Sequence, residues 1–170
     1  MSLFNITPLD YESGILLIAT NKHTEDTLQA YIDEYDVPYL QDMLGCELYD
    51  LFVADLVNGV PQSQRFIDIF NPFCKDDDCH GIQKSEGIKT MAKYFIYWEY
   101  VKQQRVNNTN TGDVINENEV SRVARVPETK LYSTYNKAIK TYCAIQWFIC
   151  DNLTVYPEFE GIIKQKTSWL

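Results

Sequence analysis

Apolar residues recur at helical spacing over most of the chain. Thr24, followed by two acidic residues, predicts the start of a helix in which large apolar side chains return every three or four positions. Asp36 and Pro38 predict the start of a short second helix, because aspartate is a common cap and proline is tolerated in a first turn. Gly45 predicts the end of that helix, and a third helix follows up to a turn at residues 58–61.

Two longer helices are predicted in the second half of the chain, over residues 85–106 and 127–152. In the first of them Tyr94, Tyr97 and Tyr100 widen the apolar stripe, so that apolar or aromatic groups occupy almost every side. A helix of this kind is covered on more than one side. We expect that a chain of this length cannot provide all of that cover, and that a neighbouring copy provides the rest.

Four segments fall outside the helical pattern. Residues 1–20 are expected to form an N-terminal arm, either extended or as a short strand that docks on something. Residues 71–86 are a polar insert that we expect to be a surface loop. We expect residues 107–126 to form a projecting loop or ribbon. Residues 153–170 are expected to form a C-terminal arm, because a polar stretch there carries isolated aromatic side chains.

Together these elements predict an all-α fold. The expected architecture is an antiparallel bundle of about four main helices within residues 21–152, with extended N- and C-terminal arms and one projecting loop. A chain of 170 residues is long enough to bury a substantial core and most simply forms one domain.

Composition narrows the class of protein. The net charge of −9, from 15 basic and 24 acidic residues, disfavours tight binding to nucleic acid. No apolar run reaches the length of a membrane span, and the first residues do not resemble a secretory signal. The five cysteines are irregularly spaced, which is typical of reduced thiols in a cytoplasm. The 12 tyrosines suit either a surface that a partner later buries or an aromatic-rich core.

Few residues have metal-binding or catalytic character. Cys74, Cys79 and His80 offer three zinc ligands at an unusual spacing without a second pair nearby, so a surface loop is the preferred interpretation. No nucleophile stands beside a base in a recognisable motif, and no glycine-rich phosphate loop occurs. We therefore expect no enzyme activity, no cofactor and no metal. Arg122 and Arg125 flank the projecting loop and could meet phosphates or a neighbour's acids, but pairing with the chain's own excess acids is favoured.

Two stretches of the sequence and the segment that follows them form a pattern of apolar spacings. Its residues are Leu40-Gln-Asp-Met-Leu-Gly45, Leu48, Tyr49, Leu51, Phe52, Gly87-Ile-Lys89, Ala92, Tyr97, Tyr100, Val101 and the Asn/Thr/Gly segment 107–114. This pattern resembles the head–tail connector proteins of tailed bacteriophages, most strongly the versions in phages of gut Bacteroides-type bacteria, including the ring proteins of crAss-like phages. The resemblance covers about residues 24–150, and the insert at 71–86 and the tail after 152 depart from it.

The resemblance implies a small helical subunit of a homo-oligomeric ring, commonly of twelve copies, that docks below the portal protein in the neck of the virion. Such a ring joins the capsid to the tail and contacts other connector or tail proteins. Double-stranded DNA passes through its channel without sequence-specific binding, and assembly takes place in the host cytoplasm without a membrane. An acidic wall would repel phosphate and let the DNA slide.

The alternative to a ring subunit is a small helical binding or regulatory module, monomeric or dimeric, that could bind zinc through Cys74, Cys79 and His80.

The resemblance also implies which residues make contacts. The loop expected to face the channel or an adjacent ring includes Asn108, Thr109, Thr111, Gly112 and Asp113. The residues expected to contact neighbouring subunits or partners are Tyr94, Tyr97, Trp98, Tyr100, Arg122, Arg125, Tyr156, Phe159 and Trp169.

Overall fold

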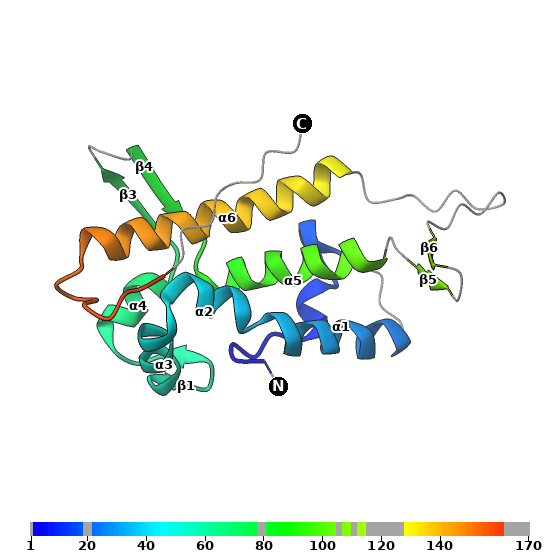
Figure 1. Ribbon diagram of the computed structural model, residues 1–170, viewed down its shortest axis with the longest axis horizontal. Coiled ribbons are helices and arrows are strands. Elements are labelled where there is room, and N and C mark those ends of the chain that lie inside the picture. Colours follow the sequence, from blue (N-terminus) through cyan, green and yellow to red (C-terminus); the bar gives the residue numbers. More distant parts are fainter. Residues whose placement is uncertain are drawn as a thin grey trace.

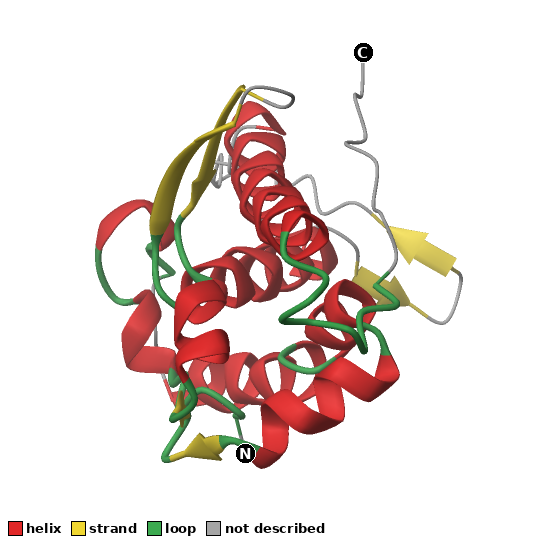
Figure 2. Cartoon of the chain, turned by 90° about the vertical axis from the view of Figure 1, so that its left-hand side faces the viewer, coloured by secondary structure: helices red, strands yellow, loops and turns green. Residues whose placement is uncertain are grey.

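The computed structural model describes residues 2–18, 22–77, 81–104, 107–109, 112–114 and 128–161. Within these residues the chain is mostly helical. Helix α5 lies in the middle, with α6 on one side of it and α1, α2 and α3 on the other, and α5 runs opposite to both α1 and α6 (Figure 1; Figure 2). The helices are α1 (Lys22–Tyr35), α2 (Pro38–Leu44), α3 (Cys46–Ala54), α4 (Gln64–Phe70), α5 (Ile88–Gln104) and α6 (Glu128–Asp151).

The expectation of an all-α fold is confirmed only in part, because the helices are joined by three short antiparallel hairpins. Each hairpin is a two-stranded sheet between strands that follow one another in the sequence. The strands are β1 (Leu56–Val57), β2 (Val60–Pro61), β3 (Phe73–Asp77), β4 (Gly81–Ser85), β5 (Asn107–Thr109) and β6 (Gly112–Val114).

The turn between β1 and β2 has a clear sequence cause. Asn58 and Gly59 have φ values of 52° and 77°, and two successive residues with positive φ define the turn type that matches the twist of a two-residue hairpin. The third helix was expected to continue up to this turn, but α3 ends at Ala54 and Leu56 lies in β1, so the Asn-Gly pair closes a hairpin and does not end the helix. It reverses the chain and directs it into α4.

The insert at residues 71–86 is a hairpin rather than the expected surface loop. Its strands β3 and β4 pair over Phe73–Asp77 and Gly81–Ser85. One face of the hairpin packs on α6: the Phe73 ring lies 5.1 Å from the Phe148 ring, and the Lys75 ammonium lies 3.7 Å from the Asp151 carboxylate. Gln83 and Ser85 of β4 are both buried.

The N-terminal segment is part of the core, which corrects the expectation of an arm that grips a neighbour. Residues 2–18 form two short 3-10 helices, η1 (Pro8–Tyr11) and η2 (Gly14–Leu16). The segment buries five large side chains within its own chain, which are Phe4, Ile6, Tyr11, Leu16 and Ile18.

Asp36 anchors the beginning of this segment. Its carboxylate accepts hydrogen bonds from the Ser2 hydroxyl at 2.7 Å and from the Leu3 backbone N–H. Burial raises the pKa of the carboxyl above its ordinary value, and the bonds from Ser2 and Leu3 oppose that rise. The expected role of Asp36 as the cap of α2 is wrong, because Val37 occupies the cap position and Pro38 the first helical position.

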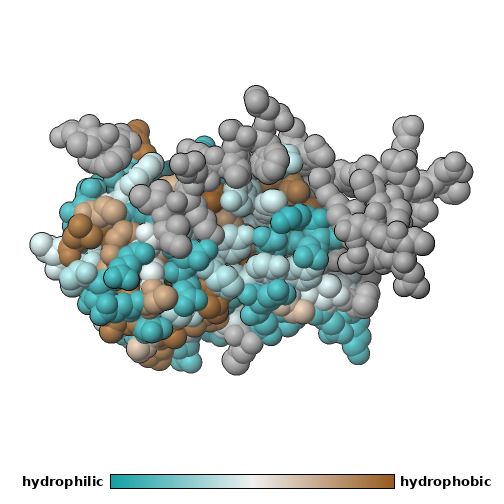
Figure 3. All heavy atoms as spheres, viewed as in Figure 1, coloured by the Kyte–Doolittle hydropathy of each residue, from teal (hydrophilic) through white to brown (hydrophobic). Residues whose placement is uncertain are grey.

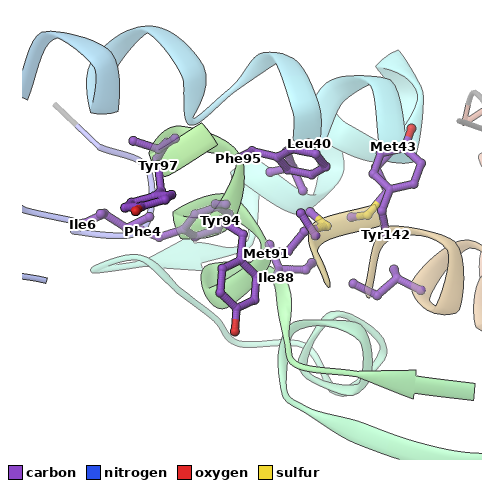
Figure 4. Packing of buried hydrophobic residues seen from close by; sticks show 14 of the residues in the cluster. Phe4, Ile6, Leu40, Met43, Ile88, Met91, Tyr94, Phe95, Tyr97 and Tyr142 are labelled. Carbon is purple, nitrogen blue, oxygen red and sulfur yellow. The ribbon is translucent and has the colours of Figure 1, made fainter. Parts of the chain in front are cut away.

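One cluster of buried residues joins these elements. Figure 4 shows part of it, with Tyr97 of α5 on the side of Phe4 and Ile6 and Phe95 on the side of Leu40. The aromatic rings of α5 thus meet the N-terminal segment and α2 within a single molecule. The core of the molecule lies along α5.

Candidate assembly surfaces

The tyrosines of α5 are covered by their own chain. Tyr94, Tyr97 and Tyr100 keep only 5%, 1% and 7% of their surface exposed. The ring of Tyr100 is in edge-to-face contact with the ring of Tyr31 of α1, and their centroids are 5.4 Å apart. Our expectation that a neighbouring copy must shelter these rings, and that they form a subunit contact, is therefore wrong.

Lysines of α6 complete the cover of the α5 tyrosines. The Lys130 ammonium lies 5.6 Å from the centre of the Tyr97 ring, and the Lys137 ammonium lies 5.9 Å from that of Tyr94. A cation over a ring face is attracted by the ring quadrupole, while the aliphatic stem covers apolar surface.

Two tyrosine hydroxyls of this region are held by carboxylates. Tyr94 donates to Glu86 at 2.6 Å, and Tyr39 donates to Glu99 at 2.5 Å. Burial, followed by the bond to the neighbouring carboxylate, raises the pKa of both phenols well above the ordinary value. Both side chains therefore stay neutral donors at physiological pH, which is a structural role.

Trp98 remains partly accessible among the aromatic residues of α5. Its ring meets that of Tyr135 edge-on at 5.0 Å, and the Lys102 ammonium lies 5.0 Å from its centre. Its indole N–H is buried and finds no acceptor among the described residues. Trp98 therefore remains a candidate contact residue, in contrast to the three tyrosines.

The described part of the C-terminal arm also packs on its own chain. Tyr156 is buried, and its hydroxyl donates to the backbone carbonyl of Arg65 in α4. Phe159 is half-buried against the core, and Glu160 lies so close to Gly45 that a side chain there would meet it at 2.8 Å. The expectation of a docking arm is wrong for residues 153–161. Trp169 lies outside the described residues.

The expected channel loop falls partly on the hairpin β5–β6. Asn108 pairs with Asp113 and Thr109 with Gly112, and the hairpin stands beyond the end of α5 in both views (Figure 1; Figure 2). These six residues match the projecting ribbon that the sequence predicted, and their place in a channel stays a prediction. Thr111, Arg122 and Arg125 lie outside the described residues.

Of the three residues in the zinc hypothesis, the structure describes one. Cys74 is a free, exposed cysteine on β3, opposite Lys84 of β4, whereas Cys79 and His80 lie outside the described residues. Within the described parts of the chain, no three histidine, cysteine, aspartate or glutamate side chains come close enough together to hold a metal ion.

Exposed aliphatic side chains form groups that sequence reasoning missed. Val57 and Val60 are paired neighbours that flank the Asn58-Gly59 turn. Leu153 and Val155 follow α6, where the Val155 carbonyl accepts a bond from Arg65. Figure 3 shows hydrophobic surface toward the end of the molecule where α3, α4 and this turn lie. Leu9, Ile15 and Leu17 of the N-terminal segment are also exposed, by 53–70%.

Comparison with known proteins adds no relative to this picture: no family model, no curated protein and no solved structure matches the chain. Of the described helices, none combines the length and the apolar character that crossing a bilayer requires.

Proposed function

We propose that this chain is a structural subunit of a phage head–tail connector, forming a ring below the portal that extends the DNA channel and joins the capsid to the tail. The surface expected to contact neighbouring copies is no longer the aromatic one. The aromatic helix α5 is sheltered within one molecule, so contacts with neighbours use other surfaces.

The grouping of exposed aliphatic side chains carries the proposal. Single exposed aliphatic residues are ordinary, but groups of them mark places where other proteins bind. The pair Val57 and Val60, the pair Leu153 and Val155, and the exposed leucines and isoleucine of the N-terminal segment lie on separate elements. A subunit that contacts several proteins at once has such a distribution, whereas a small-molecule enzyme concentrates its binding groups in one cleft.

The hairpin β5–β6 supports the same function. Its strands have three residues each, and an isolated two-stranded hairpin is marginally stable in water. A hairpin that stands away from the helical body would gain stability from a neighbouring subunit or ring. The resemblance implies that this loop faces the channel or an adjacent ring.

Virions of the phage that encodes the chain provide the test. Mass spectrometry of purified particles and cryo-electron microscopy of the neck are expected to find the chain as a ring between portal and tail. The double variant Val57→Ser, Val60→Ser is expected to reduce the yield of tailed particles, because it removes one aliphatic group. Asn71→Ser, at an exposed polar position, is the matched control and should leave the yield unchanged. A chain absent from purified virions would contradict the proposal.

A further inference from the structure

The turn of the hairpin β1–β2, formed by Asn58 and Gly59, lies against the N-terminal segment. Figure 1 and Figure 2 both show the beginning of the chain beside β1. A Cβ atom on Gly59 would lie 3.1 Å from the Leu3 carbonyl oxygen and 3.0 Å from the side-chain nitrogen of Asn5. The same nitrogen of Asn5 donates a hydrogen bond of 2.7 Å to the backbone carbonyl of Asn58. The N-terminal segment therefore holds the peptide group that joins the two turn residues.

These two turn residues are the only Asn-Gly pair in the sequence. The Asn58 side chain is exposed, and no hydrogen bond from the Gly59 N–H is found among the described residues. Glycine carries no side chain that would hinder the approach of its nitrogen to a neighbouring group. Asparagine is a thermolabile residue, and here its side-chain amide is adjacent to an accessible backbone nitrogen.

We propose that Asn58 is a deamidation site, and that the contact with the N-terminal segment limits the rate of the reaction. In the first step the Gly59 nitrogen attacks Cγ of Asn58 and a C–N bond forms. The proton of that nitrogen passes by way of water to the side-chain amide, which leaves as ammonia. Water then hydrolyses the cyclic imide at either of its carbonyl groups, which gives aspartate or isoaspartate. No group is oxidised or reduced, and water is the only co-reactant.

The folded turn opposes the first step. In the turn type that two positive φ values define, the Gly59 nitrogen is directed away from the Asn58 side chain, so the peptide group between them must rotate before the imide can close. Rotation breaks the hydrogen bond from Asn5 and moves Gly59 against the backbone of residues 3 and 4. The reaction therefore proceeds through a local opening of the turn, which short two-stranded hairpins undergo readily.

Both products change the aliphatic pair that flanks the turn. Val57 and Val60 are 55% and 50% exposed, and either product places a carboxylate between them. Isoaspartate also adds a methylene group to the main chain, and the length of a turn sets the register of the strands that it joins. Deamidation would thus alter a surface that the proposed function uses, although the reaction itself does not depend on that function.

Incubation of the purified full chain at 37 °C and mildly alkaline pH tests the proposal. Peptide mass spectrometry follows the conversion of each amide into an acid, and labelling by an isoaspartyl methyltransferase reports the isoaspartate product. Asn71 is the internal control, because it is also exposed but precedes Pro72, whose nitrogen carries no proton. Asn58 should convert at least about tenfold faster than Asn71, since the proline nitrogen cannot close the imide in the same way. Equal rates would overturn the proposal.

The variant Asn5→Asp measures the effect of the contact. Aspartate has nearly the same shape and tolerates the positive φ of 52° at this position, but its carboxylate cannot donate to the Asn58 carbonyl. Deamidation of Asn58 should become at least about threefold faster, a scale set by the loss of one hydrogen bond. Ser13→Ala is the matched control and should leave the rate unchanged, because Ser13 is exposed in the same segment and its side chain makes no cap bond.

The unfolded chain gives the rate without the contact. In concentrated urea the wild type, Asn5→Asp and Ser13→Ala should deamidate at Asn58 at one common rate, which exceeds that of the folded wild type. The proposed role of the N-terminal segment is overturned if folded Asn5→Asp reacts as slowly as the wild type, or if Ser13→Ala accelerates the reaction equally. It is also overturned if the wild type reacts as fast when folded as in urea. All of these rates are measured on the isolated chain, so none of them bears on the connector proposal.

Discussion

Gly45 and Gly14 share a backbone conformation but have very different surroundings. Their φ values are +80° and +78°, a region that costs a residue with a side chain of the order of 1–3 kcal/mol. A Cβ atom on Gly45 would lie 2.8 Å from the backbone of Glu160, whereas one on Gly14 would meet nothing within 4 Å. Backbone cannot move aside as a flexible side chain does, so the two positions differ in steric cost alone.

We predict that Gly14→Ala lowers the free energy of unfolding by about 1–2 kcal/mol, from backbone strain alone. Gly45→Ala should lower it by a further 1–3 kcal/mol or so, because it also forces α2 and α3 away from the C-terminal segment. Urea unfolding of both variants measures the difference. Equal losses would show that residues 153–161 do not pack against the α2–α3 junction.

Asp55 provides a prediction about pH. Its carboxylate accepts bonds from the backbone N–H groups of Gln62 at 2.7 Å and Ser63 at 2.8 Å, and from the Ser63 hydroxyl. These bonds, led by that of the Ser63 side chain, hold the pKa of Asp55 below its ordinary value. A carboxyl with a lowered pKa stabilises the fold above its unfolded pKa of about 3.9, and that contribution is lost as the pH falls through the folded value.

The Asp55→Ala variant should therefore be less stable than the wild type at pH 6, and the difference should shrink as the pH falls below about 4. Thermal unfolding between pH 6 and pH 3 measures it. A constant difference for Asp55→Ala would mean that its carboxylate is not preferentially bonded in the folded chain.

The N-terminal segment can be tested as an element with two different sides. Phe4 is buried, with its ring 6.2 Å from that of Phe52 and 5.9 Å from that of Phe70. Leu9, in the same segment, is 70% exposed. Phe4→Ala should lower the free energy of unfolding by about 3–5 kcal/mol, and Leu9→Ala should change it by less than about 0.5 kcal/mol. If the two losses were similar, the segment would be an arm and not a part of the core.

The apolar periodicity predicted where the long helices lie, but it did not predict which elements pack against them. The positions of α5 and α6 follow from apolar spacing and helix-stop signals, which are local. The cover of Tyr97 does not, because part of it comes from Lys130 in a distant helix. Nothing in the spacing of α5 distinguishes cover by distant segments of one chain from cover by a second copy, and this ambiguity led to the wrong assignment of the tyrosines.

The hairpins were missed for a different reason. In β3–β4 the residues that face the core include Gln83 and Ser85, so a count of apolar residues describes the segment as solvated. Asp36 was misread because a carboxylate near a helix start is usually a cap, whereas here it binds Ser2 and Leu3. The Asn58-Gly59 pair is the one hairpin signal that the sequence did contain, and it was read only as a helix stop.

At the scale of the whole molecule, α5 connects the elements that pack on its two sides. The Phe95 ring stacks on Tyr39 of α2, with centroids 3.9 Å apart and planes inclined by 3°. The same ring meets Tyr135 and Tyr142 of α6 edge-on at 5.9 and 6.4 Å. One side chain thus links all three layers, and each of these contacts joins elements that are far apart in the sequence. Such contacts form only when the whole chain is folded, so their loss should affect every layer.

We predict that Phe95→Ala lowers the free energy of unfolding by about 3–5 kcal/mol and reduces amide-hydrogen protection in α1, α5 and α6 together. Phe73→Ala is the matched control. Among the described rings, the half-buried ring of Phe73 on β3 contacts only that of Phe148 in α6. That variant should lose protection mainly in the hairpin and the end of α6. Hydrogen exchange read by mass spectrometry distinguishes the two patterns, since local openings and global unfolding have different free energies. If Phe95→Ala weakened one layer and left the others protected, the layers would fold independently.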